Sequence, residues 1–245
     1  MKQELVLIRA SNDLDAVLFK DDLETKVITD ETPMISFDKL YWKIPHITVD
    51  IPQQLALSKI LESNKEIFLG FRSWEIVEYS SISETTRHTW PVKTTNKLES
   101  PRHVVVAFQI DRKGQVKKDM SQFDDIDLTN IRVFLNSERY PYHDLHLNFK
   151  DNNFSALYEM FANFRHSYYG IATEPVFNPT DFKNISPITH IDCSHQKESI
   201  QTGSVVMRVE FETSTNVKKD TSAYCLILHD KIFSYNPLTK IVKQL

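Results

Sequence analysis

Apolar and polar residues alternate with a period of two along much of this sequence, and this alternation constrains the fold more than any other feature. Successive side chains of a β-strand point to opposite faces of a sheet, so the alternation is typical of strands with one buried face. The clearest examples run from His103 to Ile110 and from Val205 to Phe211. The side chains that we expect to be buried in these two strands are Val104, Val106, Phe108, Val205, Met207, Val209 and Phe211.

Further segments have a similar pattern, which brings the expected total to about nine strands separated by turn or loop signals. These segments are Glu4–Arg9, Leu40–Val49, Ile67–Val77, Thr86–Lys93, Asn130–Asn136, Ile188–Cys193 and Ala223–Tyr235. So many short strands in an antiparallel pattern predict an all-β chain folded as an antiparallel β-sandwich.

Two segments have the pattern of helices. In the first, Asp50 can cap the amino end and Pro52 suits the opening turn. In the second, Asn152 or Asn153 can cap the helix, and Gly170 is placed to end it in a left-handed turn. We expect both helices to lie in long connections between strands.

Composition and charge exclude several classes of protein. A chain with only 4 glycines and no phosphate-binding glycine motif is unsuited to a nucleotide-binding α/β fold. A formal net charge of -4, without a run of five Lys or Arg residues, removes the usual electrostatic basis for nucleic-acid binding. We also expect no membrane insertion and no secretion, because no apolar segment has the length of a membrane span or the form of a signal peptide.

Cysteine chemistry offers no clear catalytic site. The two cysteines, Cys193 and Cys225, are too few for a disulfide scaffold, and we expect them to be reduced and buried. From the sequence alone, a nucleophilic Cys193 or Cys225 paired with His229 remains an alternative. No Gly-x-Ser-x-Gly motif is present, and paired carboxylates stand in polar turns where ordinary pKa values are expected. We therefore predict no enzyme and no catalytic residue.

Histidine spacing does not favour a metal site. His143 and His146 would face opposite sides of a strand, whereas metal ligands must converge on one point. His190, Cys193 and His195 form a denser group. Its two histidines are also an odd number of positions apart, so they too would face opposite sides of a strand. We expect a core cysteine flanked by surface histidines, with no metal and no cofactor.

Two segments interleave aromatic rings with arginine, namely Phe71 to Trp74 and Arg165 to Gly170. Such residues are enriched at protein interfaces and can also stack on sugars or bases, while packing beneath a loop is the alternative for any single ring. The interface residues predicted on this basis are Arg72, Trp74, Arg165, Tyr168 and Tyr169.

A resemblance to one family is carried by segments spread over nearly the whole chain. They are Phe71–Glu75, Pro101–Gln109, Val133–Tyr142, Leu157–Phe161, Ser167–Gly170, Ile191–Ser194, Ser222–Asp230 and Tyr235–Thr239. In this order they resemble the capsid-like proteins of Maverick/Polinton elements. The resemblance implies a double-jelly-roll major capsid protein, similar to those of virophages and related large DNA viruses, in which trimers form pseudo-hexagonal capsomers without catalytic residues.

The resemblance also sharpens the expected fold class, domain and partners. A jelly roll needs about eight strands in two antiparallel sheets, and the predicted strands supply one such sandwich where the family has two. With no linker or repeat in the sequence, we expect residues 1–245 to form a single jelly-roll domain resembling the C-terminal half. The implied partners are two further copies in a trimer, an upstream jelly-roll half and other capsid subunits, in a virion or otherwise in the cytoplasm or nucleus.

The alternative function is a carbohydrate-binding β-sandwich. In that case an exposed Trp74, Trp90 or Tyr169 would stack on a pyranose ring.

Overall fold

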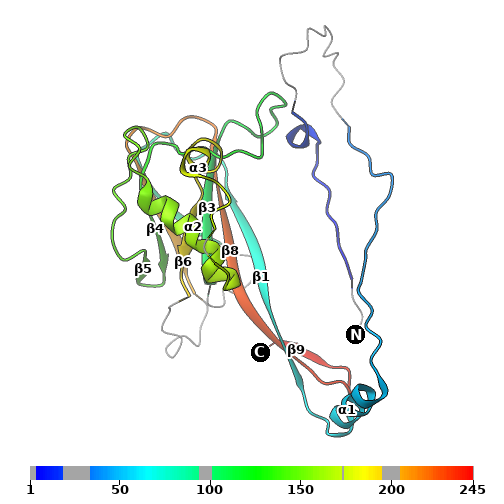
Figure 1. Cartoon of the computed structure of the whole chain (residues 1–245). Coiled ribbons are helices and arrows are strands. Elements are labelled where there is room, and N and C mark those ends of the chain that lie inside the picture. Colours follow the sequence, from blue (N-terminus) through cyan, green and yellow to red (C-terminus); the bar gives the residue numbers. More distant parts are fainter. Residues whose placement is uncertain (1–3, 19–33, 94–100, 173, 195–204, 245) are drawn as a thin grey trace.

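The computed structural model describes residues 4–18, 34–93, 101–172, 174–194 and 205–244. Strands dominate these residues, and the helices are short (Figure 1). The elements in chain order are η1 (Leu14–Ala16), α1 (Ile51–Glu62), β1 (Ile67–Tyr79), β2 (Arg87–Val92), β3 (Pro101–Ile110), β4 (Leu128–Leu135), β5 (Glu138–Tyr140), α2 (Ser155–Tyr169), α3 (Pro179–Ile185), β6 (Thr189–Asp192), β7 (Met207–Thr213), β8 (Thr221–Tyr235) and β9 (Val242–Gln244).

The strands form two antiparallel sheets. Sheet A has the order β1-β8-β3-β6, with β9 paired to the end of β8, and sheet B has the order β2-β7-β4-β5. Within the sheets β1 pairs with β8, β2 with β7, β3 with β6 and β4 with β5. This nested pairing corresponds to one long hairpin folded over into a sandwich, which is the topology of a jelly roll. The predicted fold class, an antiparallel β-sandwich of jelly-roll type, is therefore confirmed.

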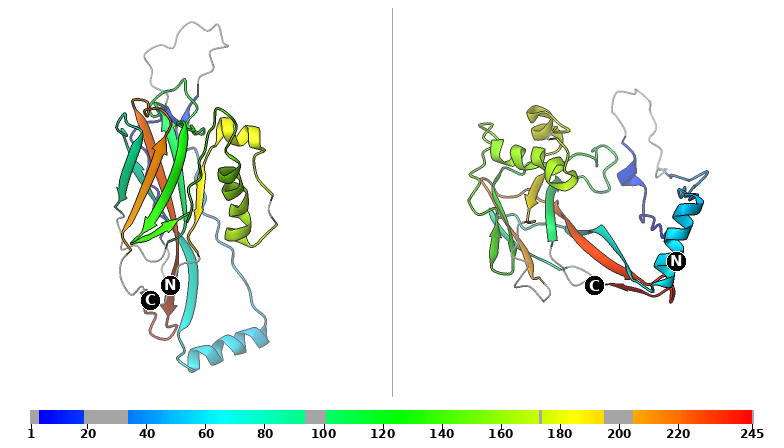
Figure 2. Two further views of the ribbon diagram at one scale, coloured as in Figure 1. Left: turned by 90° about the vertical axis from the view of Figure 1, so that its left-hand side faces the viewer. Right: turned by 60° about the horizontal axis from the view of Figure 1, so that its bottom comes forward.

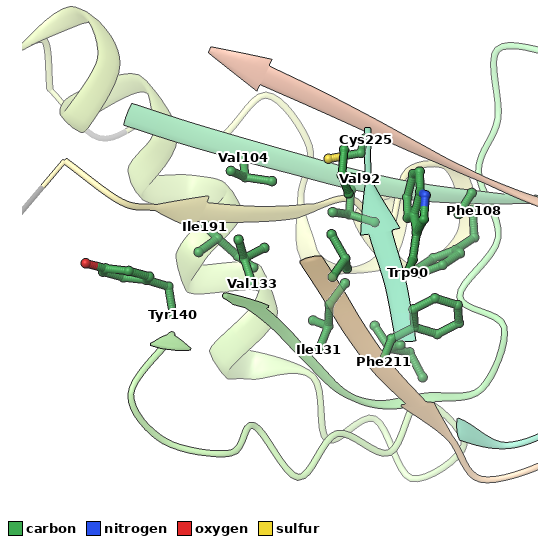
Figure 3. Close-up of a cluster of buried hydrophobic side chains, with 14 of the residues drawn as sticks. Trp90, Val92, Val104, Phe108, Ile131, Val133, Tyr140, Ile191, Phe211 and Cys225 are labelled. Atoms are coloured by element: carbon green, nitrogen blue, oxygen red, sulfur yellow. The ribbon is translucent and has the colours of Figure 1, made fainter. Parts of the chain in front are cut away.

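The hydrophobic core lies between the two sheets (Figure 3). Phe108 of sheet A packs against Phe211 of sheet B, with 5.0 Å between the ring centroids. The alternation in the sequence placed these side chains correctly, because all seven predicted core residues of β3 and the β7 region are at most 5% exposed.

Two of the predicted strands are wrong. Glu4–Arg9 and Leu40–Val49 have no strand assignment and run as extended chain outside the sandwich (Figure 1). A strand needs a neighbour to accept and donate its backbone hydrogen bonds, and no sheet of the described residues pairs with these segments. The other predicted strands are present, with ends within two residues of the expected positions. The three-residue strands β5 and β9 were not predicted.

The helices differ from expectation in the N-cap of α2 and in the presence of a third helix. α1 begins as predicted, with the Asp50 carboxylate accepting a hydrogen bond from the Gln53 amide at 3.0 Å. α2 ends as predicted at Gly170, which has φ 67°, but its N-cap is Phe154 rather than an asparagine. Asn153 is already engaged, since its backbone pairs with that of Asn148 and its amide donates to a carbonyl.

The third helix, α3, was missed, although an Asn-Pro pair marks its start. The Asn178 side chain accepts a hydrogen bond from the Asp181 amide at 2.9 Å, and Pro179 opens the helix.

We expect Phe211→Ala to lower the free energy of unfolding by about 3–5 kcal/mol, because it leaves a cavity between two sheets that pack closely. Denaturant unfolding of the purified chain measures the change. Val206→Ala is the matched control, since Val206 is 72% exposed and should shift stability by less than about 0.5 kcal/mol. Equal effects of the two substitutions would contradict the placement of Phe211 in the core.

Both cysteines are buried free thiols, and burial raises the pKa of Cys193 and raises that of Cys225 to about 12. A thiol reagent should therefore label the native chain slowly and should titrate both thiols once the chain is denatured without reductant. A count below two thiols per denatured chain would show that they are bridged.

Candidate functional site on the outer face of sheet A

Helix α2 lies across the outer face of sheet A (Figure 2). Phe164, near the middle of the helix, packs edge-on against His190 of β6 at 4.7 Å and contacts His103 of β3 at 6.0 Å between ring centroids. One turn later Tyr168 reaches Arg72 of β1, whose guanidinium carbon lies 4.2 Å from the Tyr168 ring centroid. Contacts of α2 thus extend from one edge strand of sheet A to the other.

Tyr168 is the centre of an aromatic and arginine cluster. Arg72 also donates a hydrogen bond to the Tyr168 carbonyl oxygen. The Trp74 indole N–H donates to the Tyr168 hydroxyl at 3.3 Å, and the Tyr169 ring packs edge-on against Tyr168 at 4.6 Å between centroids. The structure thereby brings together four of the five residues predicted as an interface: Arg72, Trp74, Tyr168 and Tyr169.

Arg165, the fifth, lies apart from this cluster. Its guanidinium donates to the carbonyl oxygen of Glu174 at 3.2 Å, in the segment that follows α2. Residues three apart lie on neighbouring positions of a helix surface, so the hydrogen bond to Glu174, rather than the helical position, separates Arg165 from Tyr168.

Two arginines share one carboxylate at the edge of the cluster. Arg72 of β1 and Arg102 of β3 approach the two oxygens of Asp230 on β8 at 3.3 and 3.0 Å. Arg72 and Asp230 are direct cross-strand partners, so the antiparallel register itself positions this ion pair. Arg102 further donates to the Ser194 carbonyl at 3.1 Å. These bonds hold the arginines in place while Trp74 and Tyr169 remain 58% and 60% exposed.

A pair of buried histidines lies beneath α2, and sequence reasoning missed it. His103 Nδ1 is 3.1 Å from His190 Nε2, and His190 Nδ1 is 3.0 Å from the Met160 carbonyl oxygen. Because a carbonyl only accepts, His190 Nδ1 must carry a proton, its Nε2 accepts, and His103 Nδ1 donates. In a neutral His190 ring this pairing fixes the tautomer, with the proton on Nδ1. The signal in the sequence was weak, since His103 and His190 are 87 positions apart.

Burial disfavours the charged form of both rings. It lowers the pKa of His190 to about 4 and lowers that of His103, although the Asp192 carboxylate opposes the shift at His103. An added proton on His190 Nε2 would also point at the His103 N–H. Protonation of His190 therefore weakens the docking of α2 on sheet A.

Stability should consequently fall at acidic pH. A histidine whose pKa is lowered by folding stabilises the fold above its unfolded pKa of about 6.5, and this contribution is lost as the pH falls from about 6.5 toward 4, because the unfolded chain takes up the proton first. For His190 the loss amounts to about 3 kcal/mol by pH 4. Urea unfolding at pH 7, 5.5 and 4 measures it.

His190→Gln should have a smaller pH dependence than the native chain, and His143→Gln, which changes an exposed histidine, should keep it. The same pH dependence in both variants would mean that other groups cause the loss.

The histidines singled out in the sequence come together only in part. His143 and His190 line one cleft of about 390 Å³ beside α2, together with Glu159 and Asp192. Among the described residues, however, no group of three His, Cys, Asp or Glu side chains is placed to hold a metal ion. His195 lies outside the described residues. The raised pKa values of the two thiols are the opposite of what a cysteine nucleophile needs.

The residues suggested for sugar stacking are only partly available. Trp90 is 5% exposed and packs against Tyr79 in the core, so it cannot stack on a pyranose ring. Trp74 is exposed, but its indole N–H is bonded to Tyr168.

The fold and this surface define a jelly-roll sandwich with an exposed aromatic cluster on the outer face of one sheet. The model of the family described as "Double jelly roll-like domain" matches residues 1–233. The chain therefore belongs to the double jelly roll-like domain family, and its fold is of the capsid type. The resemblance to the double-jelly-roll lineage predicted from the sequence is confirmed.

Among solved structures, a chain in the cryo-EM structure of the Sputnik virophage is similar to this protein. The two are 8% identical with a TM-score of 0.41, and the match covers 73% of this chain and 39% of the virophage chain. The protein thus spans well under half the length of that chain. A search of curated proteins found no match. In the described residues, no helix is both long and apolar enough to cross a membrane.

Proposed function

We propose that this protein is a structural capsid subunit of a DNA virus or Polinton-like element, and that its role is assembly rather than catalysis. The observation that carries the proposal is the match of the double jelly roll-like family model to residues 1–233. The collinear resemblance to Maverick/Polinton capsid-like proteins supports the same role. The chain contributes one complete jelly roll, the C-terminal one, to a trimeric pseudo-hexagonal capsomer in the virion. It is a viral, truncated or host-genome-resident copy of the capsid protein.

Exposed apolar surface supports a role in assembly. β1 and β8 continue past sheet B as a ribbon that ends near α1, and β9 pairs with the end of β8 (Figure 1). Phe68, Leu69 and Phe71 of this ribbon are 65%, 41% and 51% exposed, and Ile232 on the paired strand is 50% exposed. Apolar patches larger than a few hundred Å² are unusual on monomers. The ribbon therefore suits burial against other capsid subunits.

We expect the isolated chain to self-associate as its concentration rises, with the trimer as the largest closed species, because cyclic symmetry closes such assemblies. Sedimentation velocity over a range of concentrations measures the association. Phe68→Asp with Ile232→Asp should weaken it by at least about tenfold, because the two side chains share one face of the ribbon.

Val206→Asp is the matched control, since Val206 is 72% exposed beside sheet B, and it should associate like the native chain. A native chain that sediments as a monomer at every concentration would contradict the proposed function.

A further inference from the structure

The first half of helix α2 is anchored in the hydrophobic core. Leu157 is fully buried there, and the Phe161 ring packs on Phe182 of α3 at 5.0 Å between ring centroids. The buried residues of α2 are Leu157 and Ala162, and both precede Asn163. The first half of the helix is therefore held by apolar packing that does not involve the histidine pair.

The second half of α2, Asn163–Tyr169, rests on the two histidines. The Phe164 ring contacts both His190 and His103, and the Tyr168 ring lies 5.7 Å from the His103 ring. His190 is only 4% exposed and His103 only 1%. The surface beneath this half of the helix thus includes two buried rings of the residue type that can take up a proton near neutral pH.

A proton added to this pair has no favourable position. His190 Nδ1 already donates to the Met160 carbonyl, so the proton must go to His190 Nε2 or to His103 Nε2. The first position replaces a hydrogen-bond acceptor by a second donor, and both positions put a positive charge beneath α2. A buried charge is strongly unfavourable without water around it. Because release of the helix lets water reach the rings, a protonated pair favours the released state.

Charged and titratable groups face the pair from several elements. They are Arg72 of β1, Arg102 of β3, Asp192 of β6, Asp230 of β8, Glu159 of α2 and His143 of the segment before α2. Burial has the largest effect, and it lowers the pKa of His103 and lowers that of His190 to about 4. The Asp192 carboxylate, 3.8 Å from His103 Nδ1, opposes the shift, whereas Arg72 and Arg102 reinforce it.

We propose that the second half of α2 is an acid-dependent switch, docked on sheet A at neutral pH and released when the histidine pair takes up a proton. On release Tyr168 leaves Arg72 and Trp74, so the exposed aromatic cluster is taken apart while the sandwich stays folded. A released histidine binds a proton below about pH 6.5, whereas docked His190 binds it only near pH 4, so acid between these values favours release. The switch goes beyond the proposed function, since it is a property of the single chain.

Hydrogen exchange of the full chain at pH 7 and pH 5, measured by mass spectrometry, tests the switch. The intrinsic exchange rate at each pH, divided by the observed rate, gives a protection factor that reports how rarely an amide opens. A pKa of about 6.5 in the released state and about 4 in the docked state implies that the protection of Asn163–Tyr169 falls about 20-fold from pH 7 to pH 5. Amides of β3 and β8 should keep their protection, because these two strands pair in the middle of sheet A.

His190→Gln removes the titratable ring but keeps a donor for the Met160 carbonyl and an acceptor for His103. We expect the native protection at pH 7 and a loss of less than about fivefold at pH 5, because only His103 can then take up the proton. His143→Gln is the matched control, since His143 is exposed beside the same cleft, and it should show the native loss of about 20-fold. If α2 of His190→Gln is unprotected already at pH 7, NMR titration of the native His190 ring replaces this variant, and its midpoint must lie below about pH 5.5.

Equal protection of Asn163–Tyr169 at pH 7 and pH 5 would overturn the switch, and so would an unchanged loss of protection in His190→Gln. A titration midpoint of the native His190 ring at about pH 6.5 or above would do the same. If β3 and β8 lose protection together with α2 at pH 5, the sandwich unfolds as a whole and the local switch is wrong.

Discussion

The packing of the inner faces of sheets A and B is the interaction on which the rest of the structure depends. Val104, Val106 and Phe108 on β3 meet Val209 and Phe211 on β7, and all five are nearly inaccessible to solvent. The ladders β3–β8 and β4–β7 form the middle of each sheet, so this contact also orders the outer strands. Once these faces are buried, the alternate side chains of the same strands must point outward.

The outward side chains of sheet A create the candidate site. His103 on β3 and His190 on β6 point away from the core and become buried only because α2 covers them. Their mutual contact and that of His190 with the Met160 carbonyl link the helix to the sheet, and Tyr168 lies beside Arg72 and Trp74. The exposed aromatic surface and the buried polar pair are thus two consequences of the same helix–sheet contact.

This dependence limits how much of the site could be predicted from the sequence. Arginine interleaved with aromatic residues marked Arg72, Trp74, Tyr168 and Tyr169 as interface residues, and the structure places them together. Nothing local indicated that two segments nearly 100 positions apart would meet, since that depends on where α2 crosses the sheet. The histidine pair was missed for the same reason, and Arg165 was grouped with the cluster although its guanidinium bonds to the Glu174 carbonyl instead.

The sequence by itself determined which side chains of the sandwich strands are buried, because the direction of a side chain on a strand depends only on its position in the alternation. Tertiary structure alone decided which predicted strands found partners. Ile67–Val77 pairs with β8, whereas Leu40–Val49, with an equally apolar pattern, has no neighbouring strand among the described residues. A strand requires hydrogen bonds from another part of a chain, and no local pattern contains that information.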